Sequence, residues 1–286
     1  NIDMSNFAKR SSEMRRIIKN LSSIQIIMFA FLLVIIIGSI LLSLPISSAN
    51  GKSVPYVDAL FTATTATCVT GLVTVPTIST WSVFGQIVIL LLIQIGGLGV
   101  ITVVAGMMMI FQRKININDK IIISDSFNLN SIGGIAKFVK KVILLTFIIE
   151  LAGALLYMIV FVPEFGIKGI WVSVFTSVSA FCNAGIDIIS ENSLCGYTLN
   201  PIINITTITL IILGGIGFVV LFDLIRLSEN KKLKGLKFLS LHSKIALSLT
   251  AFLIFFGTVF IFVFEYNNPD TLGRYTFFQK IIYIAI

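Results

Sequence analysis

The chain has 286 residues, of which 56% are hydrophobic and only 12% are charged, and its mean hydropathy is +1.01. These values lie well outside the range of soluble domains. The net charge of +8 would suit a nucleic-acid partner only on a folded basic domain with interleaved aromatic residues. The composition therefore predicts a membrane protein and argues against a nucleic-acid-binding one.

Five apolar stretches are long enough to cross a hydrocarbon core of about 30 Å, which takes about 20 helical residues. They cover residues 24–44, 83–111, 142–162, 201–222 and 245–264. The first is longer than the apolar core of a secretory signal, and no small-residue cleavage pattern follows it. We therefore expect an all-α polytopic membrane protein in which residues 1–23 precede the first span.

The basic residues predict the orientation. If residues 1–23 lie in the cytoplasm, 17 of the 21 Lys and Arg residues fall on the inner side, as the positive-inside rule requires. They precede the first span or lie in two linkers, at 112–141 and 225–244. The sequence thus predicts a multi-pass protein of the plasma membrane, with its N-terminus in the cytoplasm. Its basic inner loops suit anionic membrane lipids or a partner protein.

Two segments of mixed polarity interrupt this apolar sequence, and they align without gaps. They read FTATTATCVTGL (residues 61–72) and FTSVSAFCNAGI (residues 175–186), with an offset of 114 residues. Such repetition in a membrane protein indicates internal pseudo-symmetry. We expect each copy to be a re-entrant loop that enters and leaves on the outer side. A short helix, at 56–66 or 169–180, should be followed by an extended return at 67–72 or 181–185.

Extended backbone at membrane depth is tolerated only where protein or a water-filled path satisfies its carbonyl groups. A dehydrated cation also satisfies them, and rings of carbonyl oxygens form the selectivity filters of K+ pathways. Gly71 and Gly185 suit such a filter, because turning consecutive carbonyls toward one axis requires φ values that a Cβ disfavours. The alternative for either copy alone is a surface loop rich in Thr, Ser and Gly.

A second repeat follows each loop. The segments IQIGGLGVI (residues 93–101) and IILGGIGFV (residues 211–219) place a Gly-Gly-x-Gly group at a matching depth in the next span. Small residues let membrane helices pack closely or bend. A dinucleotide-binding fingerprint is excluded, because no strand precedes either copy.

These loops, the Gly-Gly-x-Gly helices and the basic linkers resemble the Trk, Ktr and HKT superfamily of potassium uptake proteins, and among them the Ktr membrane subunit. In that family, four helix, pore loop, helix units surround one K+ path with pseudo-fourfold symmetry. The resemblance implies one unit at 24–111, a second at 142–224 and the start of a third at 245–286. We therefore expect the chain to be a fragment of a four-unit protein.

The resemblance also implies the site and its partners. Uptake of K+, passive or Na+-assisted, would need no cofactor, and K+ would bind only at the filter. A homodimer and a cytoplasmic nucleotide-binding regulatory subunit are implied as well. The alternative is a subunit of a dimeric potassium channel with two pore loops per subunit. The implied filter residues are Thr67, Cys68, Val69, Thr70, Gly71, Phe181, Cys182, Asn183, Ala184 and Gly185.

Two acidic residues near the loops are further candidates. Glu150 is the only charged residue deep within a predicted span, which makes it either a structural partner of the neighbouring pore loop or an ion ligand. Asp187 follows Gly185 and is either a concentrator of cations at the outer mouth or an ordinary loop acid. At the inner side, we expect Asp223 to pair with Arg226.

Other reactive side chains predict little chemistry. His242 is the only histidine, so neither a histidine-based metal cluster nor a catalytic triad can form. Cys68 and Cys182 occupy equivalent places in the repeat and are expected to be buried packing residues. The sequence therefore predicts a transporter and not an enzyme.

Overall fold

The computed structural model describes residues 23–99, 102, 135–229, 238–268, 271, 273 and 280. Their regular structure is helical, apart from an isolated antiparallel bridge between Ser48 and Trp81. Two described helices are long and apolar enough to cross a membrane alone, or three if one bent pair counts as a single span. The predicted all-α membrane fold is confirmed for this part of the chain.

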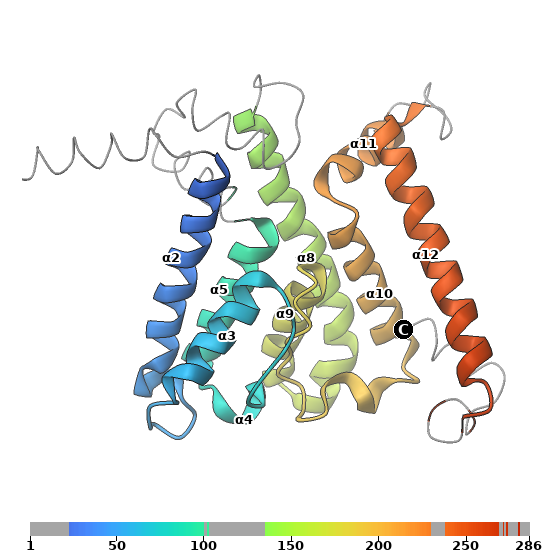
Figure 1. Ribbon diagram of the computed structural model, residues 1–286. Coiled ribbons are helices and arrows are strands. Elements are labelled where there is room, and N and C mark those ends of the chain that lie inside the picture. Colours follow the sequence, from blue (N-terminus) through green and yellow to red (C-terminus); the bar gives the residue numbers. More distant parts are fainter. Residues whose placement is uncertain are drawn as a thin grey trace, which may run out of the picture.

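The first unit consists of two long helices with a short helix between them (Figure 1). The short helix α3 begins after Pro55 and carries Asp58 in its first turn, where a carboxylate favours the positive helix end. It packs against both long helices, α2 and α5. In chain order the elements are α2 (Ser23–Ser43), η1 (Pro45–Ser47), α3 (Tyr56–Cys68), α4 (Thr77–Thr80) and α5 (Val83–Leu98).

The second unit repeats this arrangement. Its short helix α9 lies in the same half of the molecule as α3 (Figure 1). The Asn200 side chain caps the following helix by accepting hydrogen bonds from the N–H groups of Ile202 and Ile203, at 3.1 and 3.3 Å. The elements are α8 (Ile135–Phe165), α9 (Lys168–Phe181), η2 (Ser193–Tyr197) and α10 (Pro201–Gly215).

The predicted span at 201–222 is not one straight helix. Helix α10 ends at Gly215, and α11 (Phe218–Glu229) continues at an angle of 105°. Between them Gly217 has a φ of +86°, which side chains with a Cβ rarely adopt. At the same place in the first copy of the repeat, α5 ends at Leu98, and Gly99, which follows it, has a φ of +80°. Apart from residue 102, the rest of the predicted span at 83–111 lies outside the described residues.

Helix α12 (Leu241–Glu265) contains the predicted span at 245–264 and packs beside α11. No residue in the most apolar stretch of α12 is buried against the described part of the chain. Phenylalanine rings at 252, 256, 260 and 264 follow one another along one face, with centroids 4.7 to 6.0 Å apart. A pore helix expected to begin near residue 277 lies outside the described residues, and the unit boundaries stay predictions.

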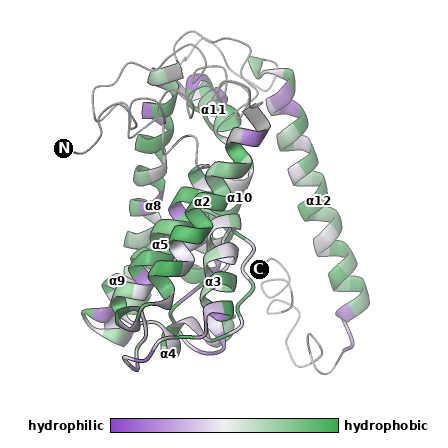
Figure 2. Ribbon diagram, turned by 60° about the vertical axis from the view of Figure 1, so that its left-hand side comes forward, coloured by the Kyte–Doolittle hydropathy of each residue, from purple (hydrophilic) through white to green (hydrophobic). Residues whose placement is uncertain are grey.

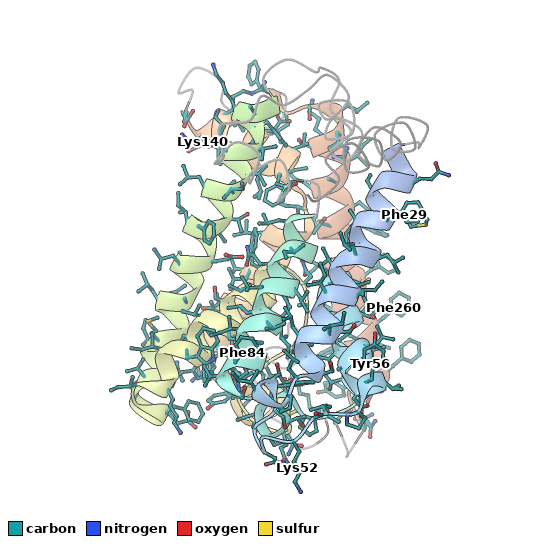
Figure 3. The ribbon with its side chains drawn as sticks, turned by 90° about the vertical axis from the view of Figure 1, so that its left-hand side faces the viewer. Phe29, Lys52, Tyr56, Phe84, Lys140 and Phe260 are labelled. Atoms are coloured by element: carbon teal, nitrogen blue, oxygen red, sulfur yellow. The ribbon has the colours of Figure 1, made fainter. Side chains whose placement is uncertain are left out.

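The outer surfaces of the helices are apolar. Figure 2 shows hydrophobic residues along the lengths of the helices and hydrophilic ones mainly toward their ends. In Figure 3, Phe29 and Phe260 point away from the body, and both are 50% exposed. Lys52 and Lys140 lie at opposite ends of the molecule in the same view. Such a surface suits a hydrocarbon surrounding.

Candidate ion-conduction site

The chain leaves α3 and α9 with the same backbone shape. Val69 and Asn183 take up left-handed conformations, with φ of 56° and 59°. Two residues later, Gly71 and Gly185 also have positive φ, of 79° and 67°. Each alternation turns the peptide groups of the returning segment away from a helical or strand pattern. The sequence repeat is therefore also a repeat of backbone conformation.

One hydroxyl residue supports each return. The Thr65 carbonyl accepts the Thr70 N–H at 3.0 Å, and the hydroxyl groups of these two residues lie 2.6 Å apart. At the equivalent place, the Ser179 carbonyl accepts the Ala184 N–H at 2.8 Å, and its hydroxyl accepts the Ile186 N–H at 3.0 Å. These bonds satisfy main-chain N–H groups of the returns and fix the path of the backbone.

The two returning segments lie against each other. A Cβ placed on Gly71 would lie 2.7 Å from the Ala184 carbonyl oxygen and 3.5 Å from the Gly185 Cα. A Cβ on Gly185 would lie 3.6 Å from the Gly71 Cα. The structure thus brings the two glycines singled out by the repeat into contact, although they are far apart in sequence.

The chemistry offered at this meeting point is that of main-chain oxygens. Negative helix ends stabilise a cation, and α3 and α9 both end here. Among the described residues, no group of three or more His, Cys, Asp or Glu side chains could hold a metal ion. Among the described residues, the meeting point is therefore made of main-chain groups and not of clustered metal-binding side chains.

Glycines of the Gly-Gly-x-Gly repeats pack on the ends of the short helices. A Cβ on Gly96 would overlap the Thr67 carbonyl oxygen, and a Cβ on Gly214 would overlap the Phe181 carbonyl oxygen. In both units the long helix therefore touches the main chain where the return begins. This contact needs a residue without a side chain.

The predicted extended returns begin later than expected. Thr67 and Cys68 form the last turn of α3, and Phe181 is the last residue of α9. The expectation that both cysteines are buried is wrong for Cys68, which is exposed, whereas Cys182 is buried. The reason is that α5 and α8 cover Cys182, while no described element covers Cys68 in the same way.

A cavity of about 180 Å³ lies beside the second return. Asp187 is part of its wall, and its carboxylate accepts hydrogen bonds from the Ile189 N–H at 3.0 Å and from the Ser193 hydroxyl. The carboxylate is therefore held in place at the cavity. Other residues of the wall are Thr176, Asn183, Gly185, Leu194 and Thr207.

Glu150 is buried in α8, behind the second return, and not in the cavity. Its carboxylate accepts a hydrogen bond from the Gln94 side chain at 2.9 Å, and its main-chain carbonyl accepts one from the Ser177 hydroxyl at 2.6 Å. The Ser177 contact joins Glu150 to α9, and both predicted roles, structural partner of the pore loop and ion ligand, stay predictions.

Sequence reasoning missed the polar residues of α5. Gln94 contacts Glu150, and Gln86 accepts a hydrogen bond from the Trp171 indole of α9 at 2.8 Å. Both residues therefore join the first unit to the second. Their signal in the sequence was the presence of two amides, eight residues apart, on an otherwise apolar helix, a spacing that places both on one side.

The helical fold with apolar outer surfaces and two similar glycine-containing returns defines a polytopic membrane protein. Residues 4–270 match the TrkH family model, described as a cation transport protein. The chain belongs to this family.

The curated relatives carry consistent names. The chain is 39% identical over 268 residues to a potassium/sodium uptake protein NtpJ of Enterococcus hirae, covering 93% of this chain and 58% of the relative. It is 41% and 35% identical to proteins named Ktr system potassium uptake protein B, from Bacillus subtilis and Vibrio alginolyticus. These matches cover 90% and 88% of this chain, and 56% and 54% of the relatives. The chain thus spans little more than half the length of these relatives.

Proposed function

We propose that this protein takes up K+ across the plasma membrane through a filter of main-chain carbonyl oxygens. The contact between the returns at Gly71 and Gly185 is the observation that carries the proposal. In this contact the main chains of the two returns meet next to the ends of two short helices, with the Ala184 carbonyl oxygen beside Gly71, and this supports a shared path lined by main-chain oxygens. The ten filter residues implied by the family resemblance lie in or next to these returns.

The driving force would be the inside-negative membrane potential, which is worth about 2.3 kcal/mol per charge per 100 mV. Passive uptake and Na+-assisted uptake both fit such a path. The name of the Enterococcus relative, a potassium/sodium uptake protein, supports a role for Na+. The N-terminus would lie in the cytoplasm, because this orientation places 17 of the 21 basic residues on the inner side.

The transporter would work as an assembly. Relatives are named as parts of a Ktr system, which supports a multi-component transporter. We propose a homodimer of membrane subunits and a nucleotide-binding regulatory subunit on the basic cytoplasmic face. The greater length of the relatives favours four pore loops in one chain over a dimeric channel with two loops per subunit.

Substitution of the filter glycines tests the proposal. We expect Gly71→Ser and Gly185→Ser to lower the preference for K+ over Na+ by about tenfold, because a strained non-glycine residue with positive φ costs about 1 to 3 kcal/mol. Uptake of both ions is measured in bacteria that lack their own K+ uptake systems. Gly51→Ser is the matched control, since Gly51 also has positive φ but has no atom within 4 Å of an added Cβ. Unchanged selectivity in both filter variants would refute the carbonyl filter.

A further inference from the structure

A buried carboxyl group stands directly behind the second return. Glu150 is 5% exposed, and its Oε1 atom accepts a hydrogen bond from the Gln94 Nε2 atom at 2.9 Å. The same oxygen lies 4.0 Å from the Cys182 sulfur, within the range of a weak thiol hydrogen bond. A carboxyl group at this depth is costly unless such partners satisfy it.

Helix α5 contacts both Glu150 and Cys182. A Cβ on Gly97 would overlap the Cys182 sulfur, so the α5 main chain presses on the cysteine. Gln94 lies one helical turn before Gly97 and therefore on the same side of α5. Cys182 is thus enclosed by a helix of the first unit and by Glu150 of the second. The Ser177 hydroxyl, bonded to the Glu150 carbonyl, joins α9 to the same point.

The first unit has no acid in the corresponding place. A close contact that occurs in both units shows which positions are equivalent. An added Cβ on Gly38 would meet Leu92 and Ala63, and an added Cβ on Gly153 would meet Leu210 and Ser177. Counting back three residues from each glycine places Ile35 opposite Glu150. The acid therefore breaks the pseudo-symmetry of the two units, at a position in the first helix of each.

We propose that Glu150 is a positioning residue for ion selectivity. As the acceptor for Gln94, it fixes the second return against the first unit and so sets the distance between the two sets of carbonyl oxygens. The inference rests on the proposed function of the returns as a filter. What Glu150 supplies is an acceptor oxygen, and its charge is not required.

Two substitutions of Glu150 in the complete transporter test this role. Glu150→Leu removes the acceptor, and we expect it to lower K+ over Na+ selectivity about threefold to tenfold, the factor that corresponds to one net hydrogen bond. Glu150→Gln keeps an acceptor oxygen and should retain the selectivity. Transporter abundance in the membrane is measured in parallel. If Glu150→Gln is as unselective as Glu150→Leu, the acceptor role is wrong.

Gln94→Leu tests the same bond from the other side, which keeps the experiment decisive if Glu150→Leu fails to reach the membrane. The double variant should be no less selective than either single one, because both remove one interaction. Additive losses would overturn the proposal.

Tyr157→Phe is the control for the loss of a buried hydrogen bond from α8. It removes the 2.6 Å contact with the Thr207 hydroxyl and leaves the Gln94 to Glu150 bond in place, so selectivity should not change. A loss equal to that of Glu150→Leu would mean that any defect in α8 lowers selectivity, which overturns the specific role of Glu150. Gly71→Ser and Gly185→Ser are assayed alongside. If they lose selectivity while Glu150→Leu keeps it, only this inference is refuted, whereas unchanged selectivity in both glycine variants refutes the filter itself.

Discussion

Glycine performs two different tasks in this protein. At Gly71 and Gly185 the backbone needs positive φ, so the residue shapes the return. At Gly96 and Gly214 the backbone is helical, and the residue is small because a carbonyl oxygen occupies the place of its side chain. The two tasks meet at one location, where a helical glycine of α5 or α10 supports the helix end from which a return begins.

Gly214→Ala is predicted to destabilise the protein. An added Cβ would overlap the Phe181 carbonyl oxygen, so either α10 or the end of α9 must move, and overpacking of this kind costs about 1 to 3 kcal/mol. The measurement is the midpoint of thermal unfolding in detergent. Gly257→Ala is the control, because Gly257 is helical and has no neighbour within 4 Å of an added Cβ. An equal loss of stability in both variants would show that overlap with the Phe181 carbonyl oxygen is not the cause.

The sequence predicted the residues of the loops better than the contacts between them. Gly71 and Gly185 could be found because an aligned repeat carries local information. The Gln94 to Glu150 bond joins residues 56 positions apart, and no local pattern specifies which amide meets a buried acid. The different exposure of Cys68 and Cys182 was missed for the same reason, since neighbouring helices decide the burial of a side chain.

At the scale of helices, hydropathy located the spans that lie within α8 and α12 but not the shape of the one at 201–222. The observed bounds of α8 and α12 contain the predicted spans, because a long apolar run is a direct property of composition. The sequence left open whether the Gly-Gly-x-Gly group at 211–219 serves close packing or a bend, because hydropathy does not report φ. Gly217 carried the signal, as the last glycine of a repeat that ends a helix in both units.

Helix α11, which follows the bend after α10, is joined to α12 by hydrogen bonds to Asp223. Its Oδ2 atom accepts hydrogen bonds from the Ser240 N–H at 3.2 Å and the Ser243 hydroxyl at 2.6 Å, and Arg226 lies 3.3 Å from Oδ1. The predicted pair of Asp223 and Arg226 is thus confirmed. Burial alone would raise the pKa of Asp223, but the hydrogen bonds from both serines and the Arg226 charge together hold it below its ordinary value.

Asp223→Ala is predicted to loosen the start of α12. Loss of the acceptor should speed the hydrogen exchange of the Ser240 amide about tenfold at neutral pH, the factor that corresponds to a hydrogen bond with a charged group at a partly exposed site. Because the folded pKa is lowered, the stabilisation is complete above the ordinary carboxyl pKa and is lost as pH falls through the lowered value. Glu229→Ala, which removes an exposed acid from the same helix, should change nothing. Equal acceleration in both variants would contradict the contact's role.

At the scale of the whole molecule, the two units are similar in backbone and different in their polar contacts. Both have the short helix, the return and the glycine contact, but the buried Gln94 to Glu150 pair belongs to the junction between them. Such a junction sets the first return against the second without altering either one. In the proposed filter, the pseudo-symmetric returns would form the path, and contacts that depart from the symmetry would adjust the distance between them.

The basic residues at the two ends of the molecule predict its orientation in the membrane. Lys52 and Lys140 are both exposed and lie at opposite ends (Figure 3), and the positive-inside rule places the end with Lys140 in the cytoplasm. In a Cys195→Ser background, an impermeant maleimide should therefore label Lys52→Cys in intact cells and leave Lys140→Cys unlabelled. A permeant maleimide should label both, which controls for the reactivity of each thiol, and the parent protein measures the contribution of the exposed Cys68. Labelling of Lys140→Cys alone from outside would mean that the protein has the opposite orientation, with the re-entrant loops open to the cytoplasm.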